Sequence, residues 1–267
     1  MGYFSTIQGS RYTSEGELSA SSSATSVTSG GANAKGSFIQ LVAATAAPAC
    51  GFWITAWPSG TGRFLIDIAL GAAASEVVIV PDILFSASVS QGALSRLFIP
   101  IPIPAGTRIS ARSQCSNATQ IARVMVQLMH SVSDGGGAGG GRMRAYGITA
   151  ASTDGVSVDP GGTPNTKGAW TQIVASTTRR IRRLYVCIAH TGGVGGLRNW
   201  LLDIGVGAGA AEVVAIPDIA IIGETNAAML LPSVAWFDRE IPAATRISAR
   251  VACGTASDPL NMAVYGL

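Results

Sequence analysis

The chain is poor in charge, because only 12% of its 267 residues are Asp, Glu, Lys or Arg, about half of the usual share. The formal net charge of +3 is too small for the strong positive field of a nucleic-acid-binding protein. Lysine occurs only at Lys35 and Lys167, so almost all cations are arginines. Since 48% of the residues are hydrophobic and few charges accompany them, we expect partner proteins to cover much of the surface.

Side chains that react or bind metals are scarce as well. The two histidines, His130 and His190, stand far apart, and the four cysteines form no CxxC motif and no Cys/His cluster. The sequence also lacks a nucleophile elbow. We therefore expect no metal, no cofactor and no catalytic residue, and we predict that the protein is not an enzyme.

One uncharged stretch, residues 36–62, is long enough to be mistaken for a membrane span. Pro48 and Pro58 interrupt it, and it contains several Ser, Thr and Gln residues. Its counterpart in the duplication described next carries four arginines. We therefore expect no membrane span, and residues 1–5 lack the basic and apolar regions of a secretory signal.

A long internal duplication organises the sequence. Residues 35–43 match residues 167–175, and residues 107–112 recur letter for letter as residues 245–250. The order of the matching segments is kept, and their offset drifts only from 132 to 138, which short loop insertions explain. A period of this length is that of a whole domain rather than of a solenoid unit.

The duplication predicts two homologous domains. We place the first over residues 35–133 and the second over residues 143–267, with a glycine-rich linker at residues 134–142. Residues 1–34 contain few apolar side chains, so they form either a disordered tail or an extended arm. We predict an extended Ser/Thr/Gly-rich arm that clamps a neighbouring subunit. Its apolar anchors would be Tyr3, Phe4, Ile7 and Tyr12.

Each repeat has the pattern of short β-strands. Phe64, Ile66 and Ile68 alternate with Leu65 and Asp67, which is the period of two that a strand requires. Further runs of this kind lie near residues 37–43, 51–57, 76–80, 84–88, 94–103, 107–114 and 120–129. We expect the Pro-Asp pair at 81–82 to end one of these strands. Eight short strands in about 100 residues predict an all-β protein of two tandem antiparallel, jelly-roll-like β-sandwiches.

Several charged residues recur at equivalent positions of both repeats. Asp67 and Glu76 of the first repeat, like Asp203 and Glu212 of the second, could form the carboxylate pairs that glycosidases use. Cross-strand pairing of an aspartate with an arginine satisfies both groups and is the interpretation that we prefer. We predict structural ion pairs that involve Asp67, Arg108, Arg112, Asp203, Arg246 and Arg250.

Aromatic side chains are few, at 6% of the residues, and two of them are candidates for a contact with a host glycan. Phe38 and Trp170 occupy equivalent positions, which suggests a place in the core of each repeat. Trp57 lies at or near the end of a predicted strand, and Trp236 has no clear aromatic counterpart in the first repeat. We therefore name Trp57 and Trp236 as the glycan candidates.

Four motifs recur in both repeats. They are Lys-Gly-x-aromatic-x-Gln-Leu/Ile-Val-Ala, Leu-Ile/Leu-Asp-Ile-x-x-Gly-Ala, Glu-Val-Val-x-x-Pro-Asp and Ile-Pro-Ala-x-Thr-Arg-Ile-Ser-Ala-Arg. In these motifs, over residues 35–129 and 167–267, the chain resembles the duplicated β-sandwich structural proteins of tailed bacteriophages. The motifs mark a scaffold and carry no reaction mechanism.

The resemblance implies a non-enzymatic virion protein that assembles in the host cytoplasm. We expect it to be associated with the tail, in a collar, baseplate or fibre. A capsid decoration protein is the first alternative, and a carbohydrate-binding receptor module is the second. The expected partners are further copies of the chain, as a trimer or hexamer, other virion proteins and, in the receptor case, a host surface glycan.

Overall fold

The computed structural model describes residues 11–15, 17–18, 23–59, 62–87, 95–130, 141–190, 196–225 and 236–267. In these residues the regular structure consists of strands and one short 3-10 helix at Ala150–Ser152, and the predicted all-β class is confirmed. Within these ranges, no helix has the length and apolar character needed to cross a membrane.

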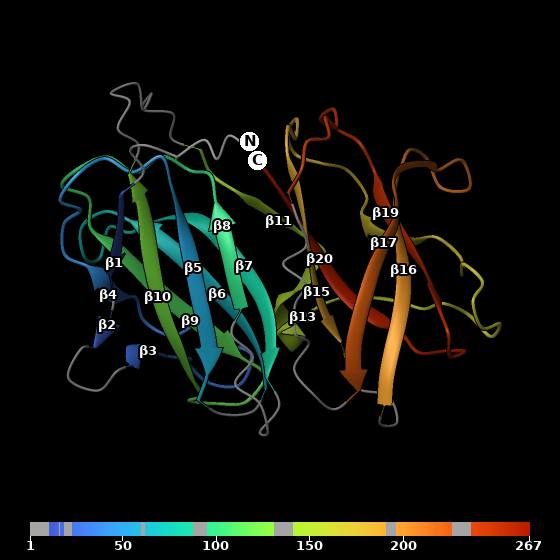
Figure 1. The fold of residues 1–267 in the computed structure, drawn as a ribbon, viewed down its shortest axis with the longest axis horizontal. Coiled ribbons are helices and arrows are strands. Elements are labelled where there is room, and N and C mark those ends of the chain that lie inside the picture. The colour runs from blue at the N-terminus through green and yellow to red at the C-terminus, as the bar shows by residue number, and fades with distance from the viewer. Residues whose placement is uncertain are drawn as a thin grey trace, which may run out of the picture.

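The first repeat is a sandwich of two antiparallel sheets (Figure 1). One sheet has the order β2-β3-β10-β5-β8, with β1 also paired to β10, and the other has the order β4-β9-β6-β7. The strands are β1 (Arg11–Glu15), β2 (Glu17–Leu18), β3 (Ser23–Thr28), β4 (Ile39–Val42), β5 (Gly51–Pro58), β6 (Gly62–Leu70), β7 (Val77–Ala87), β8 (Ser95–Ile99), β9 (Ile109–Cys115) and β10 (Ile121–His130). Strands β3 to β10 have the order of a jelly roll.

The second repeat has the same topology. Its sheets have the orders β12-β13-β20-β15-β18, with β11 paired to β20, and β14-β19-β16-β17. The strands are β11 (Arg144–Tyr146), β12 (Ile148–Thr149), β13 (Asp154–Val158), β14 (Thr171–Val174), β15 (Leu184–His190), β16 (Gly196–Val206), β17 (Val213–Thr225), β18 (Trp236–Phe237), β19 (Ile247–Cys253) and β20 (Leu260–Gly266). Every strand of the first repeat therefore has a counterpart in the second.

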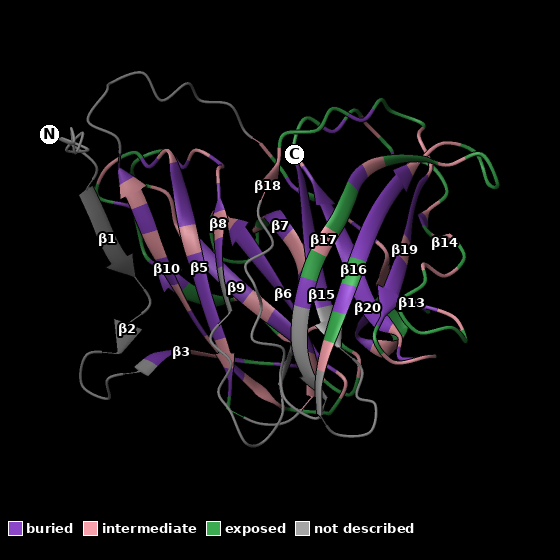
Figure 2. Ribbon diagram, turned by 45° about the vertical axis from the view of Figure 1, so that its right-hand side comes forward, coloured by how far each residue is buried: buried purple, intermediate pink, exposed green. Residues whose placement is uncertain are grey.

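Alternation of side chains along the strands builds the core of each sandwich. In β10, Val124, Val126 and Leu128 point inward and are fully buried, while the residues between them are only partly buried. Opposite them on β5 lie Phe52 and Ile54, which are also buried. Figure 2 shows this alternation as purple and pink bands along β5 and β10. Burial of one face of each sheet fixes the register, because a slip of one residue would turn that face to solvent.

The predicted end of a strand at Pro81-Asp82 is wrong, because β7 runs through this pair from Val77 to Ala87. Ile68 pairs with Val80 and Ile66 pairs with Ile83, so Pro81 and Asp82 together oppose Asp67 alone. This is a β-bulge, and β7 lies at the edge of its sheet. An edge strand with a bulge tolerates a proline because the missing N–H is not needed for the ladder.

The assignment of residues 1–34 to an extended arm is wrong for the part that the structure describes. Strand β3 pairs with the first half of β10, from Thr28 opposite Ile121 to Thr25 opposite Val124. Strand β1 pairs with the second half of β10. Their counterparts β13 and β11 make the same pairs with β20. The strand escaped detection because its only apolar residues are Ala24 and Val27, among Ser and Thr residues, and of these Val27 belongs to the core.

We expect Val27→Ala to lower the free energy of unfolding by about 2 kcal/mol, because two buried methyl groups are lost. Val27 is fully buried in the core of the first repeat. Thr28→Ala, at the next and exposed position of β3, should change stability by less than about 0.5 kcal/mol. Urea unfolding of both variants measures the difference, and equal effects would contradict the place of β3 in the sandwich.

Candidate functional site

A cluster of four charged side chains lies on the outer side of the sheet that contains β6. The Asp67 carboxylate accepts hydrogen bonds from Lys35 Nζ at 2.8 Å and from Arg112 Nε at 2.7 Å. Lys35 Nζ also lies 2.6 Å from Asp82 Oδ1, so one lysine joins two aspartates. The Asp67 side chain is only 3% exposed, and the cations that surround it neutralise a charge that would otherwise be costly to bury.

The bulge in β7 brings the second aspartate to this cluster. Asp82 has a φ of 51°, in the left-handed region that Asp tolerates better than most residues. In this conformation its backbone N–H donates to Asp67 Oδ1 at 2.8 Å instead of to a strand carbonyl. The Pro-Asp motif thus removes one donor from the ladder and turns the next donor onto a buried carboxylate.

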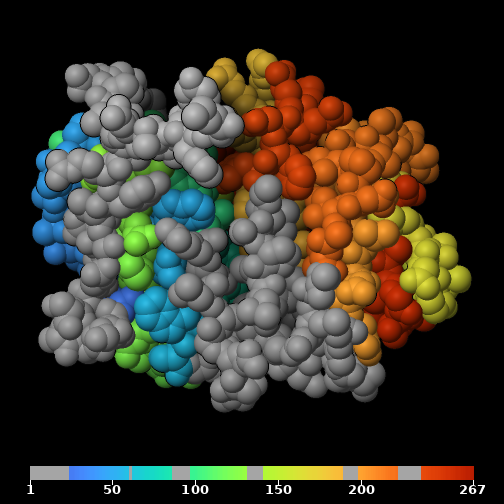
Figure 3. All heavy atoms as spheres, viewed as in Figure 1, coloured from blue at the N-terminus to red at the C-terminus, as the bar shows by residue number. Residues whose placement is uncertain are grey.

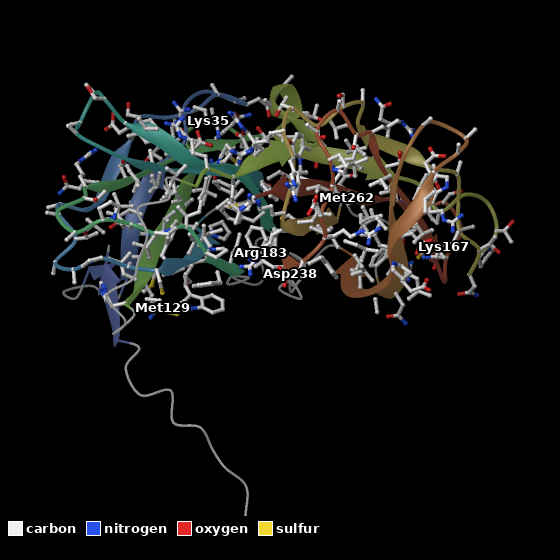
Figure 4. The ribbon with its side chains drawn as sticks, turned by 90° about the horizontal axis from the view of Figure 1, so that it is seen from above. Lys35, Met129, Lys167, Arg183, Asp238 and Met262 are labelled. Atoms are coloured by element: carbon white, nitrogen blue, oxygen red, sulfur yellow. The ribbon has the colours of Figure 1, made fainter. Side chains whose placement is uncertain are left out.

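The second repeat contains the same cluster. Asp203 accepts hydrogen bonds from Lys167 Nζ at 2.7 Å, from Arg250 Nε at 2.9 Å and from the Asp218 N–H at 2.9 Å. Lys167 Nζ lies 3.0 Å from Asp218 Oδ1. Figure 4 shows the two lysines far apart, one in each repeat. The chain therefore holds two separate copies of one arrangement.

An aromatic ring covers the arginine of each cluster. The Arg112 guanidinium lies 4.6 Å from the centre of the Phe38 ring, and that of Arg250 lies 4.5 Å from the centre of the Trp170 ring. Both rings are partly exposed, so the predicted place of Phe38 and Trp170 in the cores is wrong. The rings were equivalent because each stacks on an equivalent arginine.

The other pair of recurrent arginines binds glutamates rather than the aspartates. Arg108 Nη1 lies 3.0 Å from Glu76 Oε1, and its Nε donates to Gln40. Arg246 makes the same contacts with Glu212 and Gln172. Of the two arginines predicted for each aspartate, the structure thus places Arg112 on Asp67 and Arg250 on Asp203.

The carboxylates of Asp203 and Glu212 are held in their ionised form. Burial raises the pKa of Asp203, but the Asp218 N–H, Lys167 and Arg250 together outweigh burial and hold that pKa below its usual value. The hydrogen bond from Arg246, against an opposing contribution from burial, lowers the pKa of Glu212. Carboxylates that cations already occupy are suited to fixing strands to one another.

Acid is expected to destabilise the protein through these groups. A folded-state pKa below that of the unfolded chain stabilises the fold above the unfolded pKa, roughly 4 for Asp and Glu, and this contribution is lost as the pH falls further. Thermal unfolding at a series of pH values should therefore show a decline below about pH 4. Glu212→Gln should make that decline shallower, and an unchanged acid dependence would contradict the role of Glu212.

The two repeats share one hydrophobic cluster. The first repeat contributes an edge formed by β6 and β7, with Leu65, Ile79 and Leu84 buried there, and we call it the contact edge. The second contributes the outer face of the β15–β20 sheet, which we call the contact face. The contact face consists of Tyr185, Cys187, Trp236, Ala263, Tyr265 and Leu267.

Polar bonds join the same two surfaces. The Tyr265 hydroxyl accepts from the Leu84 N–H at 2.9 Å and donates to the Asp82 carbonyl at 2.6 Å. The Cys187 thiol donates to the Leu84 carbonyl at 2.9 Å. Burial raises the pKa of Tyr265 and of Cys187, the latter to about 12, so both remain protonated donors at neutral pH. These bonds satisfy backbone groups of β7, which is the edge strand of its sheet.

The contact between the repeats includes one of the two glycan candidates. Trp236 Nε1 donates to the Phe98 carbonyl at 2.7 Å, and its ring packs against Tyr185. Trp236 of β18 lies opposite Tyr185 of β15, as Phe98 of β8 lies opposite Trp53 of β5. Phe98 is therefore the aromatic counterpart of Trp236, and the expectation that Trp236 lacks one is wrong. Trp57 lies in β5 opposite Arg123 and is partly exposed.

The predicted arm anchors fall mostly outside the described residues. This holds for Tyr3, Phe4 and Ile7. Tyr12 lies in β1, where it pairs with Met129 of its own repeat. The arm prediction for Tyr12 is therefore corrected to a strand position within the first sandwich.

A cleft at the junction of the repeats is lined by five arginines. Glu240 pairs with Arg180, and Asp238 pairs with Arg183, as Figure 4 shows for the latter. Within the described part of the chain, the other three arginines form no ion pair with a carboxylate. The cleft is lined by Pro100, Ile101, Pro102, Gly141, Arg142, Arg179, Arg180, Arg182, Arg183 and Leu267. Four of these arginines replace Ala47, Pro48, Cys50 and Gly51 of the first repeat, so they belong to the second repeat alone.

Sequence reasoning overlooked the lysines and the second aspartate of each cluster. The signal was present, because the only two lysines of the chain occupy one repeated motif, and Pro-Asp recurs with them. The contact between the repeats left no such signal, since its two surfaces come from different faces of homologous domains.

Comparisons with known proteins add little to this picture. The sequence matches no family model and no curated protein. Among solved structures, vicilin from Solanum melongena is similar at 10% identity and a TM-score of 0.16, over 86% of this chain and 73% of that one. Vicilin from Capsicum annuum is similar at 11% identity and a TM-score of 0.17, over 86% and 74% of the two chains. Overlap this weak carries no argument about fold or function.

Proposed function

We propose that the chain is a non-enzymatic structural protein of a tailed bacteriophage particle, associated with the tail in a collar, baseplate or fibre. The observation that carries this proposal is that the charged residues that recur in both repeats form ion pairs within each sandwich. Asp67, Arg112 and their counterparts Asp203 and Arg250 are bonded to one another inside each sandwich. What the duplication has kept is therefore a scaffold, and this agrees with the resemblance of the repeated motifs to phage structural proteins.

The location in the particle is tested by the copy number of the chain. Quantitative mass spectrometry of purified particles, with labelled peptides of this chain and of the major capsid protein, measures the ratio of the two. A tail-associated protein should be present in a small multiple of the tail symmetry, and antibody labelling should mark the tail. A ratio near that of the capsid protein would favour the alternative, a decoration protein, and absence from particles would refute both.

The arginine-lined cleft favours a second function, that of a receptor module for an anionic glycan. Guanidinium groups bind carboxylate, sulfate and phosphate groups through paired hydrogen bonds. Arg182→Ala should weaken binding to sulfated or sialylated glycans on an array, whereas Arg239→Ala, which removes the same charge outside the cleft, should not. Binding that persists in both variants, or no binding by the parent protein, would refute this function.

A further inference from the structure

The contact between the repeats joins two different surfaces of homologous domains. The first repeat offers its contact edge, and the second repeat offers its contact face. Because each sandwich has the same topology, the chain carries a second copy of each surface. The second edge lies on β16 and β17, and the second face lies on β5, β8 and β10.

The second edge is exposed where the first is buried. Leu65 and Leu84 are both 0% exposed beneath the second repeat. Their counterparts by strand register are Leu201, which is 44% exposed, and Ala220, which is also exposed. Figure 2 shows the difference as green positions along β16 and β17, whereas β6 and β7 are mostly purple. The exposure of Leu201 therefore reflects a missing neighbour, since the local fold is the same.

The second face keeps the aromatic pair of the contact face, while Gln127 takes the place of Tyr265 and Thr55 that of Cys187. The ring pair Tyr185–Trp236 has its centres 5.5 Å apart at 45°, and the equivalent pair Trp53–Phe98 has them 5.1 Å apart at 51°. Met125 takes the place of the buried Ala263. Met125 and Phe98 are partly exposed, and Figure 3 shows atoms of β5 and β10 at the surface of this side of the molecule.

We infer that two copies of this chain associate by repeating the intramolecular contact between them. The β16–β17 edge of one copy docks on the β5–β8–β10 face of the next. This inference goes beyond the proposed function, since it says how further copies of the chain would bind, and it does not depend on the place of the protein in a particle. It requires that the homologous surfaces bind through their apolar and aromatic side chains, since Gln127 and Thr55 stand where Tyr265 and Cys187 bond to β7.

The geometry makes the association head-to-tail. Each copy offers one free edge and one face, so its two neighbours contact different surfaces. Such an interface continues from copy to copy until a ring closes or a filament grows. Docking would bury apolar area at Leu201 and Val214, both of which are exposed in the single chain.

Two variants block one surface each and leave the other intact. Ala220→Arg places a long charged side chain on the second edge, and Met125→Arg places one on the second face. Sedimentation velocity over a range of concentrations should show that the wild-type chain assembles beyond a dimer and that each variant alone stays monomeric. An equimolar mixture should form dimers and stop there, because the intact edge of the Met125 variant meets the intact face of the Ala220 variant.

Val213→Arg serves as the control, because its counterpart Val77 remains 41% exposed although the second repeat covers the contact edge, so this position lies outside the contact. This variant should assemble like the wild type, and unchanged thermal unfolding of the blocked variants should show that they fold. A wild-type chain that stays monomeric, or blocked variants that still assemble, would overturn the inference. Assembly of the wild type with a monomeric mixture would also overturn it, while leaving a homo-oligomer of another symmetry and the virion role intact.

Discussion

Asp67→Asn is expected to lower the free energy of unfolding by about 3 kcal/mol. The Asp67 carboxylate is 3% exposed and accepts from Lys35, from Arg112 and from the Asp82 N–H. An amide keeps the shape of the side chain but removes its negative charge, so Lys35, Arg112 and the Asp82 N–H lose the carboxylate to which all three donate. The cost lies at the lower end of the range for broken buried pairs, because the lysine and arginine are partly exposed and remain solvated.

The control for this experiment is Asp238→Asn. Asp238 pairs with Arg183 at 2.8 Å, but its side chain is 81% exposed, so loss of this pair should be nearly neutral. Asp203→Asn should behave like Asp67→Asn, because it removes the same centre in the second repeat. Guanidinium unfolding of the three variants measures the effects. Similar small changes in all of them would contradict the structural role of the clusters.

Tyr265→Ala is expected to lower the free energy of unfolding by about 4 kcal/mol and to separate the unfolding of the two repeats. Tyr265 is fully buried between the repeats, where its ring packs against Tyr185 and its hydroxyl bonds to β7. The wild-type chain should unfold in one transition, since a single hydrophobic cluster joins both sandwiches. The variant should show two transitions in calorimetry, because a cavity opens at the surface that couples them.

Tyr265→Phe separates the ring from the hydroxyl group. It keeps the buried ring but leaves the Leu84 N–H without its acceptor, which should cost about 1–2 kcal/mol. The single transition should remain. If Tyr265→Ala also unfolds in one transition with a loss similar to that of Tyr265→Phe, the ring does not couple the repeats.

The sequence alone was sufficient to predict the all-β class of the fold. It also predicted that each aspartate would pair with an arginine. Alternation of apolar residues along β6 predicted a half-buried strand, and the repeated motifs predicted the same architecture twice. Mid-strand Asp67 and the Arg-Ile-Ser-Ala-Arg motif predicted that an acid would meet an arginine. These features are local, because an aspartate on a strand between apolar neighbours has few ways to be satisfied.

Two features of the strands depended on the tertiary structure. Strand β3 has too few apolar residues to be recognised, and it forms because β10 offers it a row of hydrogen-bonding groups. Strand β7 continues through Pro81 because Asp67 accepts the N–H that the bulge turns away from the ladder. In both cases the stabilising partner lies far away in the sequence, so a window of neighbouring residues does not contain it.

The composition indicated that surfaces of this chain would be covered, and the structure decided which ones. Leu65 and Leu201 stand in equivalent motifs with equivalent neighbours in sequence, yet one is fully buried and the other is 44% exposed. The sequence likewise offered Trp236 as a candidate for a glycan contact, whereas in the fold its indole N–H donates to the Phe98 carbonyl. Two homologous sequences encode the same sandwich, but the packing of one sandwich on another is asymmetric. Burial at an interface is a property of the assembled pair, which neither repeat specifies by itself.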